Sequence, residues 1–126
     1  MAYAAITYDI KPGFEEEISE IFRGFKRVRS ADVTDLAGRQ AGRILATAVF
    51  IRDDVLVRVI EYEGDLESII RHMAKQPGVR EVEHKLAPYL TRPRDTETTA
   101  GFLMTFQRSL LNTVTEFSVR DAPVTS

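Results

Sequence analysis

Arg58 is the residue whose type and position most directly suggest chemistry in this chain. It lies in VLVRVIEYE, an alternating run that predicts a strand with two distinct faces. A guanidinium on an apolar face needs an anionic or carbonyl-rich partner, and the enolate or phenolate of a ligand would serve. The alternative is an ion pair with Glu61, Glu63 or Glu83, or with a partner subunit. The residues that share the face of Arg58 are Leu56, Ile60 and Tyr62.

Two histidines and four tyrosines are the other candidates for proton transfer or ligand contacts. We expect His72 on a helix, either bordering the interior or at its exposed rim, and His84 on a strand, either in the core or facing a cavity. Arg58, His84 and His72 are therefore the predicted catalytic residues. The spacing of the histidines matches no zinc motif, so no metal or cofactor is expected. The predicted substrate-binding residues are Tyr62, Tyr3, Leu56, Ile60 and Tyr89.

Composition and motifs exclude several classes of protein. The chain has 126 residues, a net charge of −2 and no cysteine, which excludes disulfides, thiolate nucleophiles and cysteine-based zinc sites. Charges of both signs are interspersed, so no footprint for nucleic acid or membrane is present. No phosphate loop, dinucleotide fingerprint or nucleophile elbow occurs. Without a signal peptide or a membrane span, we expect a cytoplasmic protein.

Periodicity predicts an α+β fold with the element order βαββαβ. The pattern is typical of a ferredoxin-like domain, in which two helices cover one face of a four-stranded antiparallel sheet. A long irregular connection at 27–42 would be either a functional flap or a disordered loop. Asp53 and Asp54 read as turn residues of a hairpin. The predicted strands are 3–10, 43–51, 55–62 and 79–86, and the predicted helices are 14–25 and a second one that starts after Asp65 and stops at Pro77.

The sheet face that carries Arg58 would then need a cover. We expect it to include Val82 and Leu86 on either side of His84, which makes it too apolar to remain in water. Either a second subunit or the C-terminal extension at 95–119 would cover it. One domain should span 1–119, followed by a flexible tail at 120–126. The extension shows helical spacing at Leu103, Phe106, Leu110, Val114 and Phe117.

Three segments of the chain carry a likeness to a known family: MAYAAITYDIKPGFEEEISEIFRGF, GRILATAVFIRDDVLVRVIEYEGDLE and QPGVREVEHKLAPYLTRPRDTET. They resemble the SchA/CurD-like family, which is found in clusters for aromatic polyketides and spore pigments. The tetracenomycin-type polyketide cyclases are also similar, more weakly, in Met1-Ala2-Tyr3, Ile60-Glu61, Glu81-Val82 and Tyr89-Leu90-Thr91. The resemblance implies a dimeric α+β barrel, in which a second subunit covers the open sheet face.

The resemblance implies a role in aromatic, type II polyketide biosynthesis. The leading hypothesis is a cyclase that promotes aldol cyclisation and aromatisation of a poly-β-ketone, with Arg58 stabilising the enolate. These cyclases carry a histidine where this chain has Arg58, so a histidine mechanism does not transfer to that position. The alternative is a cofactor-independent monooxygenase that forms quinones, but its Asn and Trp set is not matched, since Trp is absent and Asn112 is the only Asn.

A third hypothesis comes from a different functional class, a non-catalytic dimer that binds pigment intermediates. Under every hypothesis, the expected partners are a second copy of the chain, an aromatic polyketide intermediate and other polyketide synthase enzymes. Nucleic acid and membranes are not expected.

Overall fold

The structure is a computed structural model that describes residues 2–24, 32–34, 38–117 and 119. The predicted tail at 120–126, and the part of the predicted connection that falls at 27–31 and 35–37, lie outside the described residues. The strands are β1 (Ala2–Asp9), β2 (Asp32–Thr34), β3 (Gln40–Arg52) and β4 (Val55–Gly64). The helices are α1 (Glu15–Arg23), α2 (Leu66–Ala74), α3 (Pro77–Leu86), the 3-10 helix η1 (Ala87–Tyr89) and α4 (Thr99–Ser109).

The sheet is antiparallel with strand order β1-β4-β3-β2, which confirms the predicted α+β class. β3 and β4 form the predicted hairpin, and Asp53 at its tip has a positive φ of 52°, a conformation that aspartate tolerates in turns. β2 lies inside the segment predicted to be irregular, and it pairs antiparallel with β3, with Val33 opposite Gly42. Val33 is fully buried, so this short strand is part of the core.

The predicted strand at 79–86 is wrong, because these residues form α3. Val79, Val82 and Leu86 recur at helical spacing and are buried together, whereas a strand period would group Val82 and Leu86 with His84. Pro77 both follows the end of α2 and opens α3 at its first turn, where a missing N–H costs no hydrogen bond. One proline therefore separates two consecutive helices.

The predicted C-terminal helix is confirmed only as far as Ser109. Leu110 is extended and forms an antiparallel bridge with Ile6 of β1. The β-branched run at 113–115 loses side-chain freedom in a helix, which explains why helical spacing did not produce helix there. The edge of β1 that does not pair with β4 is contacted instead by Leu110, and Ile10, just after β1, forms a bridge with Leu90.

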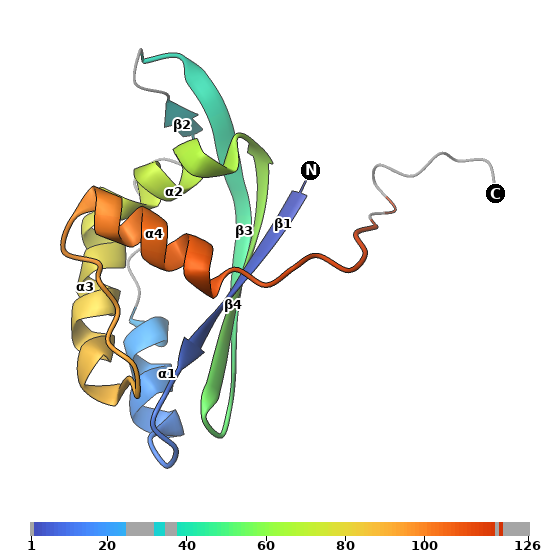
Figure 1. Cartoon of the computed structure of the whole chain (residues 1–126). Helices are drawn as coiled ribbons and strands as arrows, with labels where there is room; N and C mark the ends of the chain where they lie inside the picture. Colours follow the sequence, from blue (N-terminus) through green and yellow to red (C-terminus); the bar gives the residue numbers. More distant parts are fainter. Residues whose placement is uncertain (1, 25–31, 35–37, 118, 120–126) are drawn as a thin grey trace.

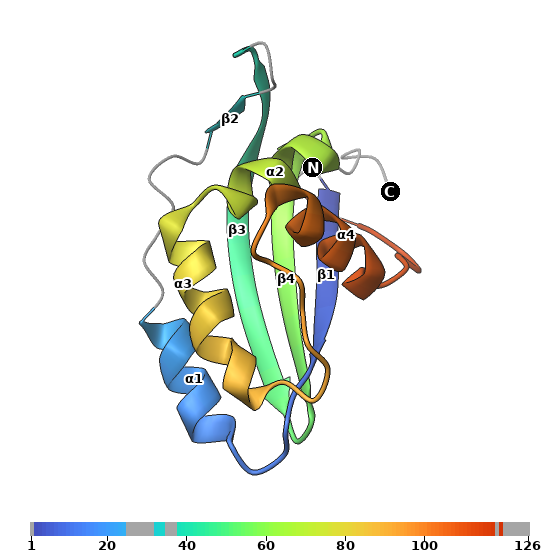
Figure 2. The same ribbon diagram turned by 60° about the vertical axis from the view of Figure 1, so that its left-hand side comes forward.

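All four α-helices of the described residues lie on one side of the sheet (Figures 1 and 2). Phe102 and Phe106 from α4 and Ile69 and Met73 from α2 are buried in the core on that side. No described helix is both long and apolar enough to cross a membrane.

The sheet face that carries Arg58 is the one that the helices cover, so the prediction that it lies opposite them is wrong. The C-terminal extension contributes to this cover, since Phe102 and Phe106 of α4 belong to the same core. Leu56, Ile60 and Tyr62 belong to the core beneath the helices. The open face instead carries Val57 and Val59, which are partly exposed. Alternation could not distinguish the two faces, because both sets of side chains on β4 are apolar. We call this second surface the open face; its other members are Tyr3, Ala5 and Thr7 of β1, Val55 and Glu61 of β4, and Phe50 of β3.

Candidate functional site in a cleft beside α1

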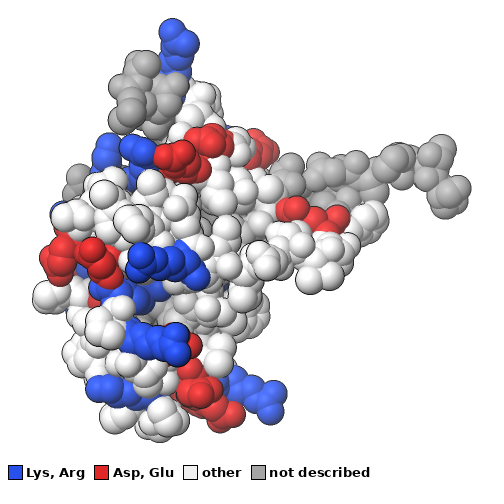
Figure 3. Space-filling view, in the orientation of Figure 1, with Lys and Arg blue, Asp and Glu red and all other residues white. Residues whose placement is uncertain are grey.

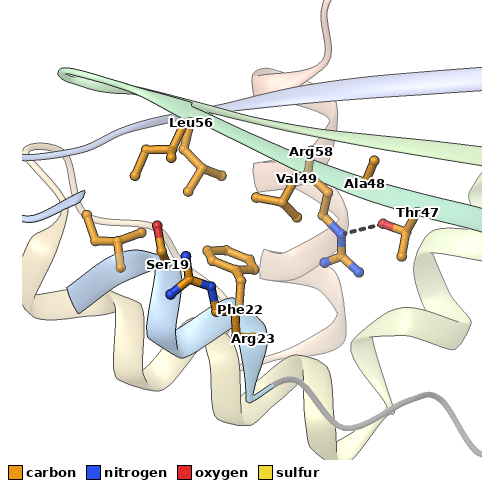
Figure 4. Close-up of a pocket in the computed structure, with 10 residues that line it drawn as sticks. Ser19, Phe22, Arg23, Thr47, Ala48, Val49, Leu56 and Arg58 are labelled. Carbon is orange, nitrogen blue, oxygen red and sulfur yellow. Dashed lines mark hydrogen bonds between the residues drawn. The ribbon is translucent and has the colours of Figure 1, made fainter. Parts of the chain in front are cut away.

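A cleft lies between α1 and the covered face of β3 and β4 (Figure 4). Its volume is about 450 Å³, which falls within the roughly 300–1,000 Å³ of typical small-molecule sites. The walls are largely apolar, with few polar groups, as is usual for sites that bind organic ligands. The lining residues are Ile18, Ser19, Phe22 and Arg23 of α1, Thr47, Ala48, Val49 and Ile51 of β3, and Leu56 and Arg58 of β4.

Arg58 supplies the charge on the sheet wall of this cleft. It is 7% exposed, and its position on the central strand β4 sets it opposite Val49 of β3. Thr47 lies two residues from Val49 on the same face, a diagonal neighbour of Arg58. Nε of Arg58 donates to Oγ1 of Thr47 at 3.5 Å, a long hydrogen bond that uses one of five guanidinium donors.

α1 provides the opposite wall and the rim. Ile18 is fully buried, and the half-buried ring of Phe22 faces the cleft (Figure 4). The guanidinium of Arg23 is exposed and pairs with Glu20 at 2.6 Å and with Glu16 at 3.4 Å. The acidic first turn and basic last turn of α1 suit the helix dipole, so the same residues that stabilise α1 place a cation at the rim.

A buried polar network connects Arg58 with α3. The hydroxyl of Tyr8 donates to Oε1 of Glu83 at 3.4 Å, and a side-chain hydrogen bond joins Tyr8 to Arg58. Arg94 binds Glu83 through Nε at 3.2 Å and through Nη2 at 3.4 Å. Its guanidinium carbon lies 4.1 Å from the centroid of the Tyr8 ring, in a cation–π contact. Tyr8 therefore joins a cation of the cleft to a buried ion pair.

Tyr8 remains a neutral phenol at physiological pH. Burial raises its pKa above the usual 10.0, and the negative charge of Glu83 raises it further, while Arg58 and Arg94 oppose the shift. A neutral hydroxyl can donate to Glu83 and accept from Arg58 at the same time. The phenol thus restricts where the guanidinium of Arg58 can lie.

The network bears on the alternative explanation for Arg58, an internal ion pair. Glu61 and Glu63 sit at odd positions of β4, so they belong to the face opposite Arg58. Glu83 is connected with Arg58 through the Tyr8 hydroxyl, and it accepts hydrogen bonds directly from Arg94. The structural role that remains for Arg58 is therefore membership of this network rather than a pair within β4.

The two histidines are not among the residues that line the cleft. His72 is half-buried on α2 and lies 3.3 Å from the Gln76 amide nitrogen. His84 is exposed on α3 and lines a separate, charged hollow of about 560 Å³ beside Glu83 and Arg94. Among the described residues, no group of three or more His, Asp or Glu could hold a metal ion.

The predicted substrate-binding residues separate in space. Leu56 lines the cleft and Ile60 is in the core. Tyr62 lies toward the far end of β4, paired with Ala2. The other two tyrosines lie outside the cleft: Tyr3 belongs to the open face, and Tyr89 packs against Phe14 with ring centroids 5.3 Å apart.

Sequence reasoning missed Thr47, Phe22 and Tyr8 as parts of the site. Phe22 follows Ile18 by four residues, which is the spacing of a packing stripe on a helix, and such a stripe can also line a cleft. To predict Thr47 and Tyr8 as site residues, one would need to know the strand register, which depends on the hairpin and on the pairing of β1 with β4. Local spacing carries no signal for either.

The fold is similar to that of a solved enzyme. The tetracenomycin F2 cyclase of Streptomyces glaucescens, described as a type II polyketide cyclase, matches with a TM-score of 0.59 and 16% sequence identity. The match covers 98% of this chain and 100% of the cyclase chain. At this identity the likeness establishes the fold and nothing finer.

Sequence comparison gives nearer relatives. Polyketide synthase CurD of Streptomyces cyaneus is 38% identical over 91 residues, which cover 72% of this chain and 23% of CurD. Protein SchA of Streptomyces halstedii is 34% identical over 112 residues, or 87% of this chain and 27% of SchA. The chain thus spans about a quarter of the length of these curated relatives. Since the SchA/CurD like domain matches residues 1–119, nearly the whole sequence, the chain belongs to the SchA/CurD-like family.

Proposed function

We propose that this chain is a cyclase of aromatic, type II polyketide biosynthesis, which folds a poly-β-ketone in the cleft and promotes its aldol cyclisation and aromatisation. The observation that carries the proposal is the guanidinium of Arg58 in a largely apolar cleft. The fold shared with a polyketide cyclase and the family that includes polyketide synthase CurD support the same reaction class.

Arg58 would act on the charge that develops during ring closure. A carbon between two carbonyls loses a proton to form an enolate, and a fixed cation in an apolar site favours that anion more than water does. A guanidinium also remains charged at every physiological pH and can hold two oxygens at once. In this proposal, Arg58 binds the enolate oxygen while water in the cleft accepts the proton.

The walls of the cleft would supply orientation. The enolate carbon attacks a second carbonyl of the same chain, the resulting alkoxide takes up a proton, and loss of water leads to the aromatic ring. Holding the two reacting carbons together removes a large entropic barrier. Phe22 offers a flat aromatic surface and Leu56 an apolar contact for holding the polyketide, and the hydroxyls of Ser19 and Thr47 can donate hydrogen bonds to ketone oxygens.

Protons would not pass through the predicted histidines. His72 and His84 do not line the cleft, so the proposal assigns them no catalytic role. Tyr8 is also unsuited to be a base, because its raised pKa keeps it protonated. The chemistry that remains to the protein is charge stabilisation and positioning.

The experiment that tests the proposal is incubation of the purified chain with a partly cyclised polyketide precursor, followed by product analysis. We expect faster ring closure and a narrower product distribution than without protein. Arg58→Leu should abolish this effect, whereas Arg52→Leu, which removes an exposed guanidinium from the hairpin outside the cleft, should retain it. An unchanged product distribution would refute a cyclase, and oxygen consumption with an anthrone-like substrate would indicate oxidation instead.

We also propose that the functional unit is a homodimer formed through the open face. Phe50 is 59% exposed there, beside the valines of β4. Apolar surface of this kind is commonly an interface. A second sheet packed on it would leave the cleft unobstructed, because the cleft lies on the covered face.

A further inference from the structure

The C-terminal arm, residues 110–117, leaves the helix side of the molecule and passes to the side of the open face (Figure 1). It is anchored on the free edge of β1 at two points. Leu111 N–H donates to the Ala5 carbonyl at 2.8 Å, and the backbone N–H of Tyr3 donates to Glu116 Oε1 at 2.6 Å. These bonds set the direction in which the arm projects.

Beyond its anchor, the arm presents apolar side chains that the described part of its own subunit leaves exposed. Val114 is 97% exposed and Phe117 is 74% exposed. The arm and β1 enclose a groove of about 390 Å³, with Tyr3 and Ala5 at its base. In Figure 3, the concave flank between the sheet and the arm is mostly uncharged, while charged side chains gather over the helices and at the ends of the sheet.

We propose that the arm of each subunit clasps a second copy of the chain, an inference that rests on the homodimer proposed above. The open face and the arm form one concave apolar surface, because Tyr3 and Ala5 belong to both. A twofold axis that brings two open faces together places each arm beside the partner subunit. The partner would then fill the groove and cover Val114 and Phe117.

Two features favour a second copy over the other possible occupants. The arm does not fold back over its own sheet, since Phe50 and Val55 of that face remain 59% and 42% exposed. A further strand from another protein is disfavoured at β1, because the arm already occupies the edge hydrogen bonds of Tyr3 and Ala5. What remains is a flat apolar partner that packs face to face, and the open face of another copy has that character.

The first test changes the arm and measures self-association by sedimentation equilibrium. Val114→Asp combined with Phe117→Asp should raise the dimer dissociation constant about ten-fold or more. Met104→Asp is the matched control, because Met104 is an apolar residue that is 52% exposed on α4 and lies outside the arm. The control should leave the dissociation constant unchanged.

A second test detects burial of the arm in the dimer without weakening the dimer. The natural chain contains no cysteine, so a thiol introduced as Val114→Cys reports on its own surroundings. Its labelling rate should fall several-fold as protein concentration rises through the dimer dissociation constant, while Met104→Cys should be labelled at a constant rate.

The possible results distinguish failure of the arm proposal from failure of the dimer proposal. A dimer whose arm variants match the control, with constant labelling at position 114, would overturn the clasp and leave the open-face dimer standing. A chain that is monomeric at tens of micromolar would overturn both. Slower labelling of position 114 only when an unrelated protein is added would also overturn the clasp.

Discussion

Arg58 joins the two properties on which the proposed chemistry depends, a permanent charge and a place in an apolar cleft. The guanidinium of Arg58 forms hydrogen bonds with the side chains of both Tyr8 and Thr47. Tyr8 retains Glu83 as a hydrogen-bond partner if Arg58 is removed. The network behind the cleft can therefore survive a substitution at this residue.

We accordingly expect Arg58→Leu to leave the free energy of unfolding nearly unchanged and to reduce cyclisation by about 100-fold or more. An apolar side chain of similar size replaces a buried charge without stranding Tyr8. Urea unfolding and product formation should be measured on the same preparation. A loss of about 3–5 kcal/mol in unfolding free energy would show that Arg58 is a structural charge instead.

Glu83 is predicted to matter for stability rather than for chemistry. Glu83→Gln leaves the guanidinium of Arg94, whose side chain is 8% exposed, without its carboxylate. Breaking a buried pair in this way costs about 3–5 kcal/mol, which urea unfolding would detect. Glu81→Gln is the control, because its pair with Lys85 is exposed and should contribute less than about 1 kcal/mol. Equal losses in the two variants would refute the importance of the buried network.

At the scale of elements, the sequence predicts a helix correctly where its capping residue and its apolar periodicity agree. Asp65 accepts hydrogen bonds from the backbone and hydroxyl of Ser68, and the apolar stripe of α2 is buried. In α3 the periodicity was ambiguous, because the apolar residues of segment 79–86 fit both the two-residue period of a strand and the 3.6-residue period of a helix. Pro77 is the local signal that favours a helix, because proline is common in the first turn, whereas it was interpreted from the sequence only as the end of the preceding helix.

Asp65→Ala should lower the free energy of unfolding by about 0.5–2 kcal/mol at neutral pH through loss of the N-cap. The hydrogen bonds from Ser68 lower the pKa of Asp65 below its usual 3.8. The contribution of the carboxylate is thus complete above the unfolded-state pKa and is lost as pH falls through the lower folded-state pKa. The difference between wild type and variant should shrink in acid.

Asp65→Asn is the control for this measurement, since asparagine caps helices about as well without a charge. It should stay near wild type at neutral pH and lack the acid-dependent part of the change. Chemical denaturation at several pH values gives both comparisons. A gap between wild type and Asp65→Ala that is constant from neutral pH to pH 2 would contradict the capping account.

At the scale of the whole molecule, the proposed site and the proposed dimer interface lie on opposite faces of the sheet. The helices and the cleft occupy the face of Arg58, and the open face presents Val57 and Val59. Val57→Asp should disrupt the homodimer, because it places a charge in the middle of the apolar interface. Light scattering at micromolar concentration would detect the monomer, with Met104→Asp as the control on the helix side. A dimer that persists would place the interface elsewhere.

The sequence alone was sufficient for the α+β class, the hairpin at Asp53 and Asp54 and the first two helices, because each of these elements depends on residues close together in the chain. Only the tertiary structure decided which face of β4 the helices cover, since both faces are apolar and differ only in what packs on them. It also brought Tyr8, Glu83 and Arg94 together from segments distant in the chain. Such contacts produce no periodic pattern in the sequence, because they depend on how separate elements pack against one another.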